Sequence, residues 1–310
     1  MLDPDTFLTS LYVRVDEFCK AALPPESRLG PGPAVTLSRS EVVTLGIFGQ
    51  WGEFPTERAF YRYAVRHLRG AFPTLPHRTQ LNRLQRRHQD AIVAFALQVG
   101  DDLGVPTAPY EALDASGVPT RNSKRRGAGW LAGQVDIGWS NRIGWYEGVH
   151  LLTSVTPDGV LTGFGIAPAS TKDQPMAETF FAGRCQPDPR LLSVGHRAGG
   201  PYLVDTGFEG TARRVFWRAA YSAVVIGPPK HHSTKPWPKP LRRWLAGLRQ
   251  IVETVYDKLH YTFRLLRERP HDLSGLRARL AAKVALHNFC IWLNVQLGRP
   301  RLAFADLVDW

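Results

Sequence analysis

The sequence contains few cysteines and no long apolar run. Its three cysteines, Cys19, Cys185 and Cys290, are far apart and form no Cys-x-x-Cys pair. This pattern argues against a structural zinc site and a disulfide framework. No segment approaches the length of about 18 uninterrupted apolar residues that a membrane span needs. The N-terminus also lacks the basic-then-apolar run of a signal peptide. We therefore expect a cytoplasmic protein with no membrane partner.

Acidic residues are scarce relative to basic ones. The chain has 39 Lys and Arg against 27 Asp and Glu, a formal net charge of +12 and a pI near 10.0. Such an excess favours polyanionic partners, nucleic acid before acidic membrane, although a basic protein without such a partner stays an alternative. The 310 residues, 44% of them hydrophobic, are enough for one large or two ordinary globular domains.

The first hundred residues carry the signals of helices. Ser38 followed by Glu41 is a capping-box pattern. Further helices are predicted from Thr56 to Leu68 and from Thr79 to Val99. We therefore predict an all-helical region at residues 1–104, followed by a second region at residues 105–310.

One segment of the helical region, residues 77–88, combines basic and amide side chains such as Gln80 and Asn82. It is either a recognition helix whose amides read bases or an ordinary solvated basic face. Both interpretations stay open. The candidate DNA contacts in this segment are Arg83, Arg86 and Arg87.

From Tyr110 onwards the pattern changes to short apolar runs typical of strands. Residues 150–155 and 160–166, separated by the turn Pro157-Asp158-Gly159, predict a hairpin. After it, predicted helices alternate with predicted strands, the helices at 170–183, 210–220 and 274–297 and the strands at 202–204 and 221–226. This order predicts an α/β fold, a mixed sheet flanked by helices.

The longest predicted helix runs from Leu241 to Arg269, between Pro240 and Pro270, with no proline inside it. Its predicted buried face consists of Trp244, Leu248, Ile251, Val252, Val255 and Leu259. A different face carries Arg249, Glu253, Tyr256 and His260.

Two aspartates stand at the ends of predicted strands, where an α/β sheet presents reactive side chains. They are Asp114, in Ala-Leu-Asp-Ala-Ser, and Asp205, in Leu-Val-Asp-Thr-Gly. Glu253 follows on the long helix. Three carboxylates suit magnesium, which prefers oxygen ligands, far better than His and Cys clusters would.

In this order of acids the sequence resembles the DDE transposases of bacterial insertion sequences, which have a ribonuclease-H-like catalytic core. Asp205-Thr-Gly-Phe208 is similar to the Asp-Lys-Gly-Tyr motif of the family, and Arg249-x-x-x-Glu253 is similar to part of its Tyr-Arg-Glu-Lys signature. The segment from Gly165 to Asp173 resembles the family segment before the central helix. The chain departs from the family pattern at Thr206 and His260, where the family has lysines.

The resemblance implies that residues 1–104 serve DNA binding or dimerisation and that residues 105–310 are a ribonuclease-H-like catalytic domain. The implied activity is metal-dependent cleavage at transposon ends, followed by transfer of the 3′-hydroxyls to target DNA. It implies two Mg²⁺ ions, with Mn²⁺ as a substitute, Asp114 bridging both ions and Asp205 and Glu253 each completing one coordination sphere. The partners would be double-stranded terminal inverted repeats and target DNA, with a homodimer assembled on DNA at the nucleoid. A nuclease that cuts without joining and a domesticated DNA-binding protein with an inactive core are the alternatives.

Further DNA contacts are predicted around the long helix. Arg249 and His260 would face DNA phosphate, unless Arg249 pairs with Glu253 and His260 lies on the surface. Tyr256 would contact sugar or phosphate, or simply pack.

Two basic segments complete the prediction. A loop with Lys230, Lys235, Trp237 and Lys239 would bind a distorted DNA end, with the tryptophan stacking on a base or instead covering the edge of the core. Arg125 and Arg126 would contact phosphate or belong to a flexible loop.

Overall fold

The computed structural model describes residues 1–25, 36–121, 131, 133–185, 200–208, 210–230 and 233–310. These residues form two compact units. The helical unit comprises Met1–Val99, Tyr261–Arg264 and Asp272–Trp310, and the sheet unit comprises Gly100–His260 and Leu265–His271. The last helix thus groups with the N-terminal helices, whereas the predicted division at residue 104 assigned it to the second domain.

The helical unit is built from α1 (Pro4–Ala22), α2 (Arg39–Phe48), α3 (Glu57–His67), α4 (Arg78–Arg87), most of α5 (Gln89–Asp102) and α9 (Leu273–Gln296). The predicted capping box is present at α2, where Ser38 Oγ accepts from the Glu41 N–H (3.3 Å) and Glu41 Oε2 accepts from the Ser38 N–H (2.6 Å). The predicted helix from Thr79 to Val99 is wrong. It is interrupted at His88, where no glycine or proline marks the break in the sequence.

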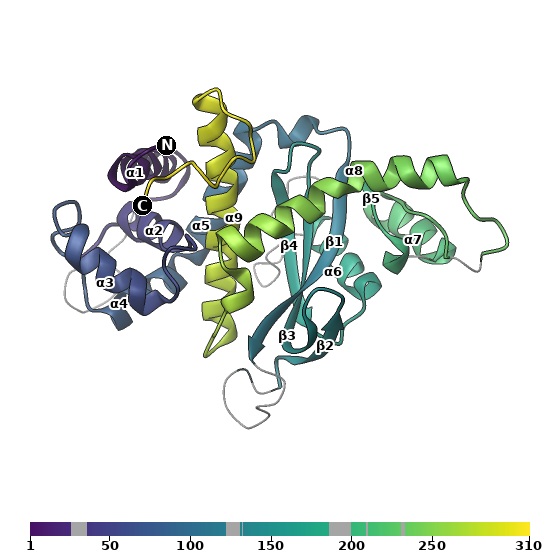
Figure 1. Ribbon diagram of the computed structural model, residues 1–310, viewed down its shortest axis with the longest axis horizontal. Helices are drawn as coiled ribbons and strands as arrows, with labels where there is room; N and C mark the ends of the chain where they lie inside the picture. Colours follow the sequence, from purple (N-terminus) through teal and green to yellow (C-terminus); the bar gives the residue numbers. More distant parts are fainter. Residues whose placement is uncertain (26–35, 122–130, 132, 186–199, 209, 231–232) are drawn as a thin grey trace. The chain divides into compact units, whose positions relative to one another are not determined.

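Helix α9 is buried on most of its sides, and some of its buried side chains are polar. Lys283 is only 1% exposed, and its Nζ donates to Gln50 Oε1 at 2.9 Å. The two chain ends meet in this unit, because the Leu2 N–H donates to the Leu307 carbonyl and the Asp309 N–H donates to the Leu2 carbonyl. Figure 1 shows the two termini side by side.

The sheet unit contains a six-stranded mixed sheet. Its strands are β1 (Glu111–Arg121), β2 (Asp136–Ser140), β3 (Gly144–Val155), β4 (Leu161–Pro168), β5 (Gly200–Leu203) and β6 (Ala223–Ile226). They lie in the order β2-β3-β1-β5-β6, and β4 also pairs with β3. Strand β3 is antiparallel to β1, β2 and β4, whereas β1, β5 and β6 are parallel. The predicted hairpin and mixed sheet are confirmed, and β2 is an addition.

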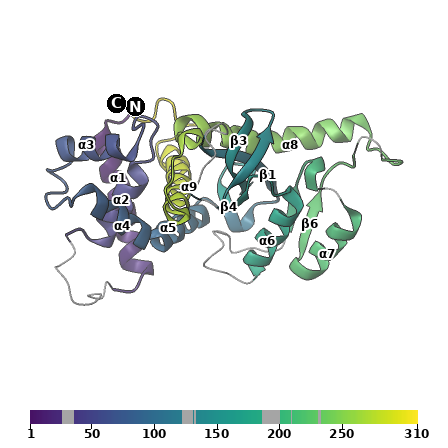
Figure 2. The same ribbon diagram turned by 90° about the horizontal axis from the view of Figure 1, so that it is seen from below.

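Helices cover both faces of this sheet (Figure 1, Figure 2). On one face, α6 (Asp173–Cys185) and α7 (Thr211–Tyr221) bury Phe181 and Trp217 in one apolar cluster with Leu113 of β1. On the other face lies α8 (Lys239–Asp257), whose Tyr256 contacts β1 and β3. Because side chains alternate along a strand, Leu113 points towards α6 and Asp114 points towards α8.

The long helix differs from its prediction in extent and in rotation. α8 ends at Asp257, a π-helical turn follows at Lys258–Thr262, and Arg264 has a φ of 49°. Trp244, predicted to be buried, is 59% exposed, whereas its neighbour Leu245 is 2% exposed. The first six residues of α8 are all exposed, so only the later turns, with Val252 and Val255, pack on the sheet.

Candidate active site

Asp114 and Asp205 stand at the same level on neighbouring parallel strands. Ala112 of β1 pairs with Leu203 of β5, and each aspartate lies two residues further along its own strand direction. Asp205 therefore lies just past the carboxyl end of β5, as predicted. Asp114 lies inside β1, which continues beside β3 to Arg121, so the prediction that Asp114 ends a strand is wrong.

The Asp114 side chain is three-quarters buried and lies beside a cation. Its Oδ2 is 3.4 Å from Arg249 Nη2, and its Oδ1 accepts the Ala115 N–H at 2.9 Å. Burial raises the pKa of Asp114 to about 7; Arg249 opposes that rise and the nearby Asp205 adds to it. Arg249 thus pairs with the first acid of the site, rather than with Glu253 or with solvent.

Helix α8 positions Glu253 beside this pair. Arg249 contacts the Asp114 carboxylate, and the Tyr256 hydroxyl lies 3.0 Å from the Asp114 carbonyl oxygen. Glu253 is four residues after Arg249 and three before Tyr256, which puts its Cβ on the same side of the helix. Its side chain is exposed to solvent.

A third aspartate, Asp173 at the start of α6, lies close to Asp205. The Gly207 N–H donates to Asp205 Oδ1 at 2.8 Å. A Cβ on Gly207 would stand 3.0 Å from that oxygen and closer still to Asp173 Oδ2. The glycine therefore keeps open the space between the two carboxylates.

Asp173 also faces a histidine. His150 Nδ1 lies 3.0 Å from the Thr171 carbonyl oxygen, so it carries the proton and donates it there, and it is 3.8 Å from Asp173 Oδ1. Burial raises the pKa of Asp173; His150 opposes the rise and Asp205 reinforces it. Asp173 Oδ1 is buried and accepts no hydrogen bond from any residue that the structure describes.

Two predicted DNA contacts on the long helix are buried. Tyr256 is 4% exposed, with its hydroxyl between the carbonyl oxygens of Asp114 and Leu151. His260 is 2% exposed; its Nδ1 accepts from Arg142 Nη1 at 2.9 Å, and its ring stacks on Tyr256. This burial favours the alternative that Tyr256 packs in the protein, and it argues against the predicted DNA contacts of both side chains. Their helical spacing was read as one exposed face, whereas the π-turn and the rotation of α8 turn them inwards.

The basic residues predicted on other elements have mixed positions. Lys230, Lys235 and Lys239 are exposed and Trp237 is partly buried. Arg83 and Arg87 are exposed on α4. Arg125 and Arg126 lie outside the described residues.

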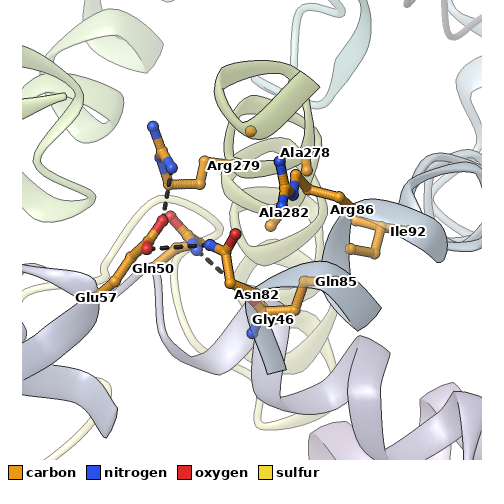
Figure 3. Close-up of a pocket in the computed structure, with 11 residues that line it drawn as sticks. Gly46, Gln50, Glu57, Asn82, Gln85, Arg86, Ile92, Ala278, Arg279 and Ala282 are labelled. Atoms are coloured by element: carbon orange, nitrogen blue, oxygen red, sulfur yellow. Dashed lines mark hydrogen bonds and ion pairs between the residues drawn. The ribbon is translucent and has the colours of Figure 1, made fainter. Parts of the chain in front are cut away.

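The inner face of α4 takes part in a polar network of the helical unit (Figure 3). Asn82 Nδ2 donates to Glu57 Oε2 at 3.1 Å, and Arg279 Nη1 lies 2.6 Å from Glu57 Oε1. Arg86 pairs with Asp272 at 2.8 Å. Asn82 and Arg86 thus have protein partners, which argues against the predicted base and phosphate contacts at these two positions.

The carboxylates of the candidate site are suitable ligands for a divalent cation, although they do not form one coordination sphere. Within the described part of the chain, no three His, Cys, Asp or Glu side chains lie close enough together to hold a metal ion. The carboxylates of the three predicted acids therefore do not converge on one point: Asp114 contacts Arg249, and Glu253 is exposed to solvent. The site offers oxygen donors, which magnesium prefers, and the buried, unpartnered Asp173 Oδ1 is an acceptor that a cation could satisfy.

Comparison with known proteins places the chain in a family. The family model described as "Transposase DDE domain" matches residues 112–289, more than half of the chain. The chain belongs to this transposase family. The matched range begins on β1 and includes Asp114, Asp205 and Glu253. The mixed sheet and its flanking helices are those of a ribonuclease-H-like transposase core, as predicted.

Two further comparisons add little to this transposase assignment. A solved structure of the Mos1 transposase paired-end complex with left transposon end is similar, at 11% sequence identity and a TM-score of 0.23, over 82% of this chain and 86% of that one. That likeness is too distant to place any residue or partner here. A search of curated proteins found no match. None of the helices in the described residues is long and apolar enough to cross a membrane.

Sequence reasoning missed two features of the sheet unit. Asp173 was noted only as part of a family-like segment; its position at the start of the helix that follows the predicted hairpin is the signal that could have identified it. Arg184 of α6, fully buried, pairs with Glu111 at 3.0 Å and donates to the Tyr202 hydroxyl at 2.8 Å. This buried ion pair anchors α6 under the start of β1, and so supports the strand that carries Asp114.

Proposed function

We propose that this chain is a DNA transposase that cleaves the ends of its own transposon and joins the resulting 3′-hydroxyls to target DNA. The observation that carries the proposal is the pairing of β1 with β5, which aligns Asp114 with Asp205 inside the matched family region. Glu253 would be the third acid, reached from α8.

The proposed roles follow from where each acid lies. Asp114 and Asp205 would hold divalent cations where β1 passes the carboxyl end of β5, and Glu253 would complete the site from α8 by a change of side-chain rotamer. Bound there, Mg²⁺ or Mn²⁺ would stabilise the charge that develops on the attacking and leaving oxygens of a phosphodiester. Arg249 holds the Asp114 carboxylate at 3.4 Å, so it would orient that acid and offset its charge until cations and DNA arrive.

The DNA would lie along a segment with no acidic residue. Residues 210–252 contain nine Lys and Arg and no Asp or Glu. Seven of these nine are exposed, namely Arg213, Arg218, Lys230, Lys235, Lys239, Arg242 and Arg243. The segment connects Asp205 to Glu253, so phosphates bound along it would lead towards the acids.

The helical unit offers a second basic surface for the transposon end. Gln80, Arg83 and Arg87 are exposed on one side of α4, at the i, i+3, i+7 spacing of one helix face. We assign this outer face of α4, rather than its inner face with Asn82 and Arg86, to end recognition. Cleavage at both ends would need two copies of the chain, and hence a homodimer on DNA.

The test is an assay of cutting and joining on DNA that carries the terminal inverted repeats of the element. The wild-type protein should give cut ends and joined products with Mg²⁺ or Mn²⁺, and neither product with EDTA. Asp114→Asn and Asp205→Asn should each lower both products by roughly 10³-fold, since each variant would lose several kcal/mol of charge stabilisation. Cut ends without joined products would instead support a nuclease, and salt-sensitive DNA binding without cleavage would support an inactive DNA-binding protein.

A further inference from the structure

Asp173 and Asp205 face each other across a gap that only a glycine at position 207 leaves open. Asp205 Oδ1 lies 3.0 Å from the point where a Cβ of Gly207 would stand, and Asp173 Oδ2 lies closer to it, so the two oxygens are at most about 6 Å apart. Gly207 has an ordinary negative-φ backbone, since it is not among the positive-φ residues. The glycine is therefore needed here for space and not for its backbone conformation.

The Asp205 side of this gap is fixed by the backbone. The Gly207 N–H donates to Asp205 Oδ1 at 2.8 Å, which holds that carboxylate at the start of the 3₁₀ turn Thr206–Phe208. The Asp173 side is set by α6, because Asp173 is its first residue. Both carboxylates thus come from ordered elements.

Nothing in the described part of the protein satisfies the inner oxygen of Asp173. Its Oδ1 is buried without a hydrogen bond, and the His150 Nδ1 that lies 3.8 Å away already donates to the Thr171 carbonyl oxygen. A buried carboxylate oxygen without a partner costs free energy unless something binds it. A cation between Asp173 and Asp205 would be held by the Asp173 carboxylate, whose Oδ2 faces the gap, and would offset the repulsion between the two acids.

We propose that Asp173 is a fourth acid of the metal site and binds the same divalent cation as Asp205, across Gly207. This proposal rests on the proposed function, because it assumes that Asp205 is a metal ligand. Magnesium is commonly held by one or two carboxylates, with waters and substrate phosphates as its other ligands. Ligand oxygens at about 2.1 Å from one ion lie roughly 3–4 Å apart. Small side-chain rotations would bring the two oxygens to that distance.

The test measures metal binding directly, without DNA and without turnover. Mn²⁺ is titrated into the full-length protein, and free Mn²⁺ is followed by its electron paramagnetic resonance signal. We expect Asp173→Asn and Asp205→Asn each to weaken binding of one Mn²⁺ by at least about tenfold. The double variant should bind that ion hardly more weakly than either single variant, because the two side chains share it. Asp158→Asn, in the exposed turn after β3, is the control and should bind as wild type.

Gly207→Ala provides a second variant, in which no acidic residue is replaced. Its Cβ would fill the gap and separate Asp173 from Asp205, so Mn²⁺ affinity should fall as it does in Asp173→Asn. Thermal unfolding of each variant without metal identifies loss of fold. If Asp173→Asn does not fold, the Gly207→Ala titration alone decides between the two outcomes.

The outcomes separate this proposal from the proposed function. The role of Asp173 would be overturned if Asp173→Asn binds Mn²⁺ like the wild type while Asp205→Asn binds it more weakly, and the transposase site would stay intact. If Asp173→Asn does not fold, wild-type binding in Gly207→Ala has the same meaning. Wild-type binding in Asp205→Asn as well as in Asp114→Asn would contradict the metal site itself. A fall in unfolding temperature in Asp173→Asn with unchanged Mn²⁺ affinity would reduce Asp173 to a structural residue and also overturn the proposal.

Discussion

The Tyr256 hydroxyl lies 3.0 Å from the carbonyl oxygen of Asp114, so the helix that carries Glu253 is hydrogen-bonded to the strand residue that carries the first acid. The same hydroxyl lies 2.7 Å from the Leu151 carbonyl oxygen on β3. One buried phenol therefore ties α8 to two neighbouring strands at the level of the proposed site.

Removal of this hydroxyl tests how α8 is positioned. Tyr256→Phe should lower the free energy of unfolding by about 1 kcal/mol, since a buried hydrogen bond is lost while the ring is kept. It should also slow end cleavage by about tenfold or more, because α8 would be less firmly placed against Asp114. Denaturant unfolding and single-turnover cleavage measure the two effects. Cleavage at the wild-type rate would show that the hydroxyl does not position the site.

Asp114 should make the metal-free protein less stable as the pH rises. Its pKa is about 7 in the folded chain against 3.8 when unfolded, so between these values the folded state binds more protons. Stability should therefore fall by a few kcal/mol from about pH 4 to about pH 8, and Asp114→Asn should lack this part of the pH dependence. Thermal unfolding in EDTA over that range measures the difference between the two proteins. A difference that does not change with pH would contradict the burial of this carboxylate.

His260 should cause the opposite trend at acid pH. Burial, with the adjacent Arg142, lowers the pKa of His260 from 6.5 to about 4, so the unfolded chain binds a proton that the folded chain does not. The contribution of His260 to stability is fully present above pH 6.5 and should be lost as the pH falls towards 4, by about 3 kcal/mol. His260→Gln should show less acid sensitivity than the wild type in unfolding at pH 4 and pH 7. Equal acid sensitivity in both proteins would indicate an accessible histidine.

The exposed basic residues at the start of α8 should contribute to DNA affinity through charge. A triple variant, Lys239→Glu with Arg242→Glu and Arg243→Glu, should weaken binding to transposon-end DNA by at least about tenfold and reduce the slope of log affinity against log salt by up to about 3. The charge-conserving variant Lys239→Arg with Arg242→Lys and Arg243→Lys is the matched control. Equal salt slopes for the wild type and the Glu variant would remove these residues from the DNA path.

The two aspartates could be identified as candidate site residues from the sequence, because each follows a local pattern. Asp114 and Asp205 directly follow short apolar runs, and the parallel pairing of β1 with β5 then sets them level. The capping box at Ser38 is likewise a local signal, and it is present.

The environment of the acids could not be predicted, because it depends on how α8 is rotated and where it ends. A shift of one residue in the buried face exchanges Trp244 for Leu245. The same rotation, with the π-turn after Asp257, encloses Tyr256 and His260 and leaves Glu253 exposed. The partner of Arg249 is Asp114, 135 positions earlier in the chain, and spacing on one helix carries no information about such a contact.

The measurement that tests the central claim most directly is single-turnover cleavage of transposon-end DNA by Glu253→Gln in Mg²⁺. Asp257→Asn, one turn later on α8 and also exposed, is the matched control. If Glu253 completes the site with Asp114 and Asp205, its variant should cleave about 10³-fold more slowly, with unchanged DNA affinity and unfolding temperature. The Asp257 variant should cleave like the wild type. Cleavage by Glu253→Gln at a rate within tenfold of wild type would contradict the proposed site.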